Sequence, residues 1–103
     1  MPNYLLLFHG GGMPETEAEV AQVMAAWGAW YEKLGAGVVD PGDPTFARKM
    51  IAPDGTVSDA DAGPSGYTII AAGSTDEAVA LASDCPILAG GGAIQVCETM
   101  PVM

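Results

Sequence analysis

The sequence predicts a single α+β domain in which two helices pack on one small antiparallel sheet. Short apolar runs of strand length alternate with two longer segments of helical periodicity. Half of the residues are apolar, which excludes a disordered chain. The length suits a single hydrophobic core, so we expect one domain over residues 1–103.

The first predicted strand covers residues 4–8, where five consecutive apolar residues indicate a strand covered on both faces. The chain's one histidine, His9, follows at its tip, and three glycines, Gly10, Gly11 and Gly12, come next. Glycines let the backbone turn sharply into the helical pattern that follows. We expect a binding site at this junction.

The first helix is predicted over residues 15–34. A capping box of Thr16 and Glu19 begins it, and Gly35 ends it in a left-handed conformation. A stripe of apolar side chains is expected to pack on the sheet along the whole helix, and it consists of Val20, Val23, Met24, Trp27, Trp30, Tyr31 and Leu34.

Residues 38–39 begin a short second strand, which two prolines end. A hairpin excursion is predicted next, with arms at 46–51 and 56–58 around a turn that contains an Asp-Gly step. Residues 67–72 then form another buried strand.

A second capping box, Ser74-Thr75-Asp76-Glu77, begins the second helix, and Pro86 prevents its continuation. Residues 87–92 are predicted to form a loop, and residues 93–100 alternate in the manner of a last strand. The whole order is that of a ferredoxin-like βαββαβ domain with an inserted β-hairpin.

In such a domain both helices cover the same face of the sheet. Leu5 and Leu7 point away from the side chains that flank them in the strand, and Ile69 is opposed to Ile70, so the helix-free face is apolar too. A second copy of the chain is the simplest cover. We therefore expect a homodimer packed through its sheets, with a cavity between the sheet and the partner.

The net charge of −10, from three basic and thirteen acidic residues, argues against nucleic-acid partners and anionic membrane surfaces. No apolar run approaches the roughly 20 residues of a membrane span, and the N-terminus lacks the features of a signal peptide. We expect a cytoplasmic protein. Cys85 and Cys97 are expected to be reduced, buried thiols.

Several motifs occur in a characteristic order: Tyr-Leu-Leu-Leu-Phe-His at the start, Gly63-Pro64 before Tyr67-Thr68-Ile69-Ile70, and Ser74-Thr75-Asp76-Glu77-Ala78 before Cys85-Pro86. In this order and spacing, over nearly the whole chain, the sequence resembles the YCII-related (YciI-like, DGPF-type) family. The resemblance implies a dimeric α+β barrel, a fold that hosts monooxygenases, isomerases, dehydrochlorinases and dye peroxidases, as well as proteins without known activity.

The sequence departs from that family in two places. The Asp-Gly-Pro-Phe signature occurs only as Asp61-Ala62-Gly63-Pro64-Ser65. The family's His–Asp pair has its histidine near the first helix, where residues 15–24 contain none, while Asp40 occupies the expected place of the aspartate. This chain could keep a His–Asp pair only if His9 has taken over the role of the family's histidine.

His9 is the side chain best suited to general acid–base chemistry, with Asp40 or Asp61 as an orienting carboxylate. The alternative is a structural histidine that bonds to a backbone carbonyl. The N–H groups of residues 10–12 could bind a carboxylate or other small anion at the helix N-terminus, or the glycines could simply form a turn.

The sequence lacks the motifs that other kinds of catalytic or cofactor site require. No Gly-x-Ser-x-Gly accompanies the His-Gly-Gly-Gly run, and the glycines at 90–92 lack nucleotide-binding spacing, so hydrolase triads, nucleotide binding and other cofactors are not expected. One histidine with dispersed carboxylates predicts no metal site. The leading hypothesis is a cofactor-free enzyme of isomerase or lyase type, acting on a small organic molecule in an apolar cavity. The alternative is a non-catalytic dimeric module that binds a metabolite or a protein.

Overall fold

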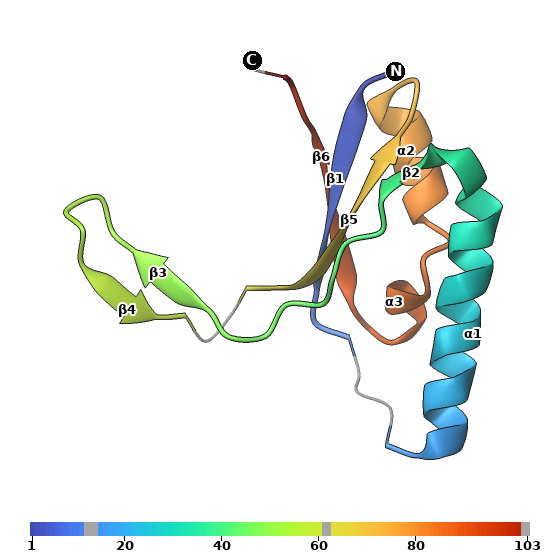
Figure 1. Cartoon of the computed structure of the whole chain (residues 1–103), viewed down its shortest axis with the longest axis horizontal. Helices are drawn as coiled ribbons and strands as arrows, with labels where there is room; N and C mark the ends of the chain where they lie inside the picture. The colour runs from blue at the N-terminus through green and yellow to red at the C-terminus, as the bar shows by residue number, and fades with distance from the viewer. Residues whose placement is uncertain (12–14, 61–62, 102–103) are drawn as a thin grey trace.

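A computed structural model describes residues 1–11, 15–60 and 63–101 of the protein. In these residues the fold is α+β, with a four-stranded antiparallel sheet and a separate two-stranded sheet (Figure 1). The elements in chain order are β1 (Asn3–His9), α1 (Glu17–Leu34), the 3-10 turn η1 (Gly35–Gly37), β2 (Val38–Asp40), β3 (Lys49–Ile51), β4 (Val57–Asp59), β5 (Pro64–Ala71), α2 (Thr75–Ala82), α3 (Pro86–Ala89) and β6 (Ala93–Glu98).

Strand β1 lies inside the larger sheet, whose order is β2-β5-β1-β6 with antiparallel neighbours throughout. Its five apolar residues therefore have strand neighbours on both edges, but in the described residues the predicted cover is found on one face alone, beneath the helices. Strands β3 and β4 pair only with each other and form the predicted hairpin. The predicted α+β class is confirmed.

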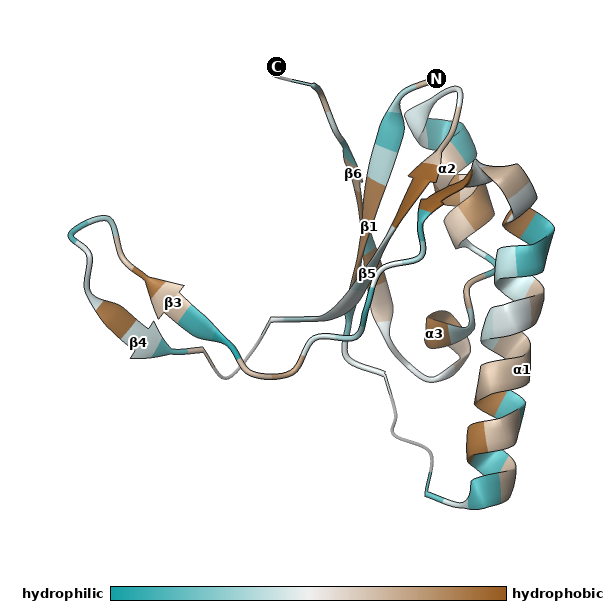
Figure 2. Ribbon diagram, viewed as in Figure 1, coloured by the Kyte–Doolittle hydropathy of each residue, from teal (hydrophilic) through white to brown (hydrophobic). Residues whose placement is uncertain are grey.

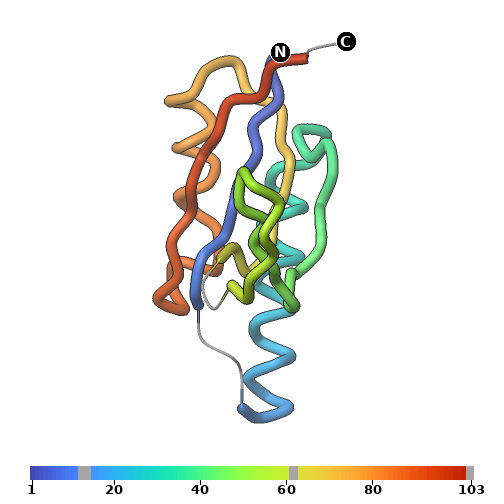
Figure 3. Tube along the Cα trace, turned by 90° about the vertical axis from the view of Figure 1, so that its left-hand side faces the viewer, coloured from blue at the N-terminus to red at the C-terminus, as the bar shows by residue number. Residues whose placement is uncertain are grey.

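All helices lie on one face of the larger sheet, and the β3–β4 hairpin projects from the other face (Figures 1 and 3). Side chains alternate accordingly along β1, where Tyr4, Leu6 and Phe8 are buried beneath the helices. Thr68 and Ile70 of β5 are buried on the same side. The predicted alternation is confirmed.

An aromatic cluster joins α1 to the sheet. The ring centroids of Phe8 and Trp27 lie 5.3 Å apart, edge to face, and those of Trp27 and Trp30 lie 5.7 Å apart. Trp30 is almost fully buried, and its indole N–H donates to the carbonyl of Leu81 in α2 at 3.0 Å. This bond satisfies the one polar group of the buried ring and fixes α2 beside α1.

The hydroxyl bond of each predicted capping box is present, and at α1 the carboxylate bond is present too. Thr16 Oγ1 accepts from the N–H of Glu19 at 3.1 Å, and the Glu19 carboxylate accepts from the N–H of Glu15 at 2.8 Å. Ser74 Oγ accepts from the N–H of Glu77 at 3.1 Å. These bonds satisfy backbone donors that the first turn of a helix leaves free, which explains why both helix starts are readable from sequence.

The first two turns of α1 correct the prediction that its whole apolar stripe packs on the sheet. Val20, Val23 and Met24 are 44%, 39% and 68% exposed. The 18 residues of α1 span about 27 Å, and the helix runs past the lower end of the sheet in Figure 1. Only its C-terminal half, from Trp27 onward, lies over the strands and contributes to the core.

The prediction of a loop over residues 87–92 is also wrong in part, because Pro86 starts α3 rather than only ending α2. Proline suits the first position of a helix, where its missing N–H has no intrahelical partner. Gly90 then closes this short helix, and its N–H donates to the carbonyl of Ile87.

Gly42 gives a sharp test of the chain path after β2. Its φ is +72°, and a Cβ there would lie 1.8 Å from the carbonyl oxygen of Tyr67. Gly55 in the hairpin turn has φ +89° with no atom within 4 Å of such a Cβ. Gly55→Ala should cost about 1 kcal/mol for its left-handed backbone, and Gly42→Ala at least about 2 kcal/mol more for the clash. Urea unfolding measures both, and equal losses would contradict the described path.

Candidate functional site

The helix-free face of the larger sheet is the candidate site. On β1, β5 and β6 its side chains are those that alternate with the buried ones, and none of these carries a fixed charge; they are Leu5, Leu7, His9, Tyr67, Ile69, Gln95 and Cys97. Most of them are half-buried, although no helix covers this side. Charged residues occur at its margins, where Asp40 of β2 pairs with Ile69 and Arg48 Nε donates to the carbonyl of Pro64, the strand partner of His9. A sheet face of this kind can receive an apolar ligand or another protein surface.

His9 sits at the lower end of this face. It pairs with Pro64 of β5 and Ala93 of β6, and its side chain is half-buried. Because Phe8 faces the helices, the imidazole of His9 points to the opposite side. Within the described part of the chain the ring makes no hydrogen bond, so the expected bond to a backbone carbonyl is not seen there.

Two polar side chains near His9, those of Tyr67 and Gln95, were not identified from the sequence. Leu7 is flanked in register by Tyr67 on β5 and Gln95 on β6. Each is a diagonal neighbour of His9 across the strands, about 7–8 Å away between Cα atoms. The alternation of side chains along each strand could have identified them, because Tyr67 and Gln95 point to the face opposite that of their neighbours Thr68 and Val96. A phenol, an amide and an imidazole thus surround one leucine.

Asp40 does not lie beside His9 in the folded protein. It pairs with Ile69, which in turn lies opposite Leu5, so four residues and two strands separate Asp40 from His9. This corresponds to about 13 Å along the strands and about 10 Å across them. The Asp40 carboxylate instead accepts from the N–H of Gly42 at 2.8 Å and closes the turn after β2.

Gly10 and Gly11 form a turn between β1 and the approach to α1. Their φ values are +72° and +92°, a conformation that favours glycine. A Cβ on Gly11 would lie 3.3 Å from the Cγ1 of Ile87, so this turn runs beside α3. The candidates Gly12 and Asp61 lie outside the described residues.

The N-terminus of α1 is poorly suited to an anion. Thr16 and Glu19 already accept from backbone N–H groups at this end, and Glu15 and Glu17 add further negative charge. An incoming carboxylate would meet these side chains before it reached the helix dipole. Gly10 and Gly11 therefore have a clearer role in turning the chain than in binding an anion.

A buried polar group anchors the loop after β2 on the helix side. Thr68 Oγ1 donates to the carbonyl of Pro41 at 2.9 Å and lies 3.1 Å from the hydroxyl of Tyr31. Burial raises the pKa of Tyr31; the bond to Thr68 opposes this, and a negative charge on Cys85 would add to it. The group contributes to the core and does not reach the helix-free face.

His9 lines neither of two hollows that the described residues form. One, of about 310 Å³, lies between the chain ends, and the other, of about 190 Å³, lies beside α2 and β6. No set of three His, Cys, Asp or Glu residues converges as a metal site within the described ranges. Neither of these two hollows is the cavity expected over the helix-free face.

Scans against family models, curated proteins and solved structures each found no match. The fold and the face define a small α+β protein with one sheet surface that no helix covers. The assignment to the YCII-related family stays a prediction from motif order. None of the helices described is long and apolar enough to cross a bilayer.

The Cys85 thiol predicts a loss of stability in alkali. Cys85 is almost fully buried, and this burial raises its pKa from 9.0 to about 11. The raised pKa stabilises the fold below about pH 9, and the stabilisation is lost as the pH rises towards 11. The free energy of unfolding should fall by about 2 kcal/mol between about pH 8 and about pH 10.5. Cys85→Ala should flatten this slope in urea titrations, and equal slopes would contradict the assignment.

Asp40 should behave as a turn residue. Asp40→Ala removes the acceptor for the Gly42 N–H, and the free energy of unfolding should fall by about 1 kcal/mol. Asp40→Asn keeps an oxygen acceptor and should lose less. The ring resonances of His9 in NMR spectra should not move in either variant, and a shift in both would indicate that the two side chains meet.

Proposed function

We propose that the protein is a homodimer that binds a small organic molecule between the helix-free faces of two copies. The observation that supports this most directly is the composition of that face: His9 is half-buried among β1, β5 and β6 side chains that carry no fixed charge. A molecule held there would be surrounded by Leu5, Leu7 and Ile69, with His9, Tyr67 and Gln95 at one end of the site.

The proposal includes a ferredoxin-like domain of the dimeric α+β barrel type. The strand order β2-β5-β1-β6, the antiparallel pairing and the placement of α1 and α2 on one face support it. The β3–β4 hairpin is then the insertion between the two halves of the domain. Two such sheets face to face would close the cavity that one copy leaves open.

We further propose that His9 exchanges a proton with the bound molecule, without a cofactor, as in an isomerase or lyase. Imidazole is suited to this step near neutral pH. Tyr67 and Gln95 lie where they can donate hydrogen bonds to a carbonyl or carboxylate held near His9.

A non-catalytic binding module is the second candidate. It is favoured by the position of Asp40, which serves a turn and is two strands from His9. If no carboxylate orients the imidazole, His9 would contribute to ligand recognition alone.

Sedimentation and a thermal-shift screen test the proposal together. Wild type should sediment as a dimer, and Ile69→Lys should give a folded monomer because it places a charge on the face. A ligand at 100 times its dissociation constant should stabilise wild type by about 2.7 kcal/mol, and His9→Gln should lose this shift. A monomeric wild type, or a hit that Ile69→Lys and His9→Gln both retain, would contradict the site.

Solvent exchange separates the two candidates. Proton transfer by His9 should carry deuterium from D2O into the bound molecule, and NMR of the recovered ligand detects it. His9→Gln should abolish this incorporation. A ligand that binds at this face without incorporation would favour the non-catalytic module.

A further inference from the structure

The β3–β4 hairpin extends from the helix-free side of the sheet as a separate arm (Figures 1 and 3). At its base the N–H of Thr45 donates to the carbonyl of Ser65 at 3.0 Å, and Arg48 Nε donates to the carbonyl of Pro64 at 3.3 Å. Beyond that base, β3 and β4 pair with each other alone. An isolated two-stranded hairpin is only marginally stable in water.

This arm exposes large apolar side chains on both of its faces. Phe46, Met50, Ile51 and Val57 are 75%, 58%, 69% and 60% exposed. Ile51 and Val57 are opposite each other in register and share one face, while Met50 lies on the other. Figure 2 shows these apolar stretches on a segment far from the core. Such a segment is typical of a surface that is buried in an assembly.

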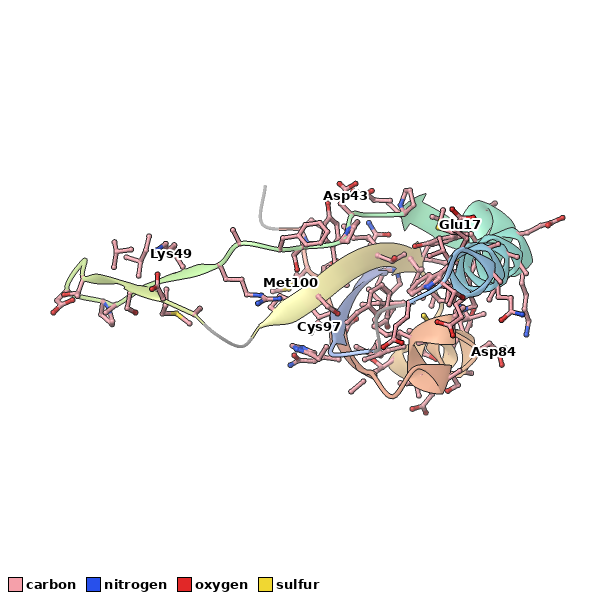
Figure 4. The ribbon with its side chains drawn as sticks, turned by 90° about the horizontal axis from the view of Figure 1, so that it is seen from below. Glu17, Asp43, Lys49, Asp84, Cys97 and Met100 are labelled. Carbon is pink, nitrogen blue, oxygen red and sulfur yellow. The ribbon has the colours of Figure 1, made fainter. Side chains whose placement is uncertain are left out.

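The distribution of charge favours a second copy of the chain as the partner. Residues 45–60 carry Arg48 and Lys49 against Asp54 and Asp59 and are neutral, whereas the rest of the chain holds one cation and eleven carboxylates. The arm thus has two of the three cations in the protein, well away from Glu17 and Asp84 (Figure 4). The rest of one copy would be repelled by the acidic surface of another copy. A neutral arm with its cations at the base avoids this repulsion and is therefore better suited to contact an acidic partner.

The size of the helix-free face points the same way. Seven residues of β1 and four strands give a projected area of roughly 20 by 23 Å, or about 450 Å². Stable interfaces bury about 800 Å² on each partner. The face alone is therefore a small interface, and the arm adds exposed apolar side chains on the same side of the sheet.

The reach of the arm fits this role. Residues 46–51, if extended, span about 20 Å, whereas two sheets pack about 10 Å apart. We propose that the β3–β4 hairpin is a dimerisation arm, which passes the partner's sheet and packs Met50, Ile51 and Val57 against the partner subunit. This inference rests on the homodimer proposed above and adds a second contact to it.

Matched methionines test the arm. Met50→Glu adds a charge to the arm, and Met24→Glu adds the same charge to an equally exposed site on α1, 68% against 58%. Sedimentation equilibrium of the full chain should give a dimer dissociation constant at least about tenfold higher for Met50→Glu than for wild type. Met24→Glu should match wild type.

A mixed-label experiment tests the contact without any substitution. In dimers of one labelled and one unlabelled copy, isotope-filtered NMR should detect contacts from the Met50 methyl group to protons of the other copy. The proposed role of the arm is overturned if Met50→Glu dimerises like wild type and no such contacts occur, while Ile69→Lys is still monomeric. A monomeric wild type would overturn the homodimer as well.

Discussion

The fold depends on how β1 is covered. One face of this strand is sealed, because Tyr4, Leu6 and Phe8 lie beneath the helices with almost no exposure. The other face carries Leu5, Leu7 and His9 and has no helix over it. The strand has neighbours on both edges, so its hydrogen bonds are satisfied whatever covers that second face. The buried core and the helix-free face thus lie on opposite sides of the same backbone.

The two sides are linked by register. Side chains alternate with a period of two, so a slip of one residue would bring His9 under the helices and turn Phe8 outward. The aromatic contact between Phe8 and Trp27 opposes this slip, because it packs β1 in one register against α1. The packing of the core therefore also decides that the imidazole lies on the helix-free face.

Local features of the fold were predictable because short-range chemistry produces them. The capping boxes at Thr16 and Ser74 and the Asp-Gly hairpin turn need only residues a few positions apart. The exposure of Val20 and Met24 was not predictable, since helical periodicity does not say how far a helix extends past a sheet. The dual role of Pro86 was hidden because proline both ends one helix and suits the start of another.

For the candidate site, the residue pattern was enough to identify a lone histidine, the turn that Gly10 and Gly11 allow, and the apolar alternation of β1. The positions of Tyr67 and Gln95 beside Leu7, and of Asp40 two strands from His9, emerged only from the folded sheet. Alternation assigns each side chain to a face within its own strand, and no further. The order of strands and the register between them come from long-range pairing, which brings distant segments together.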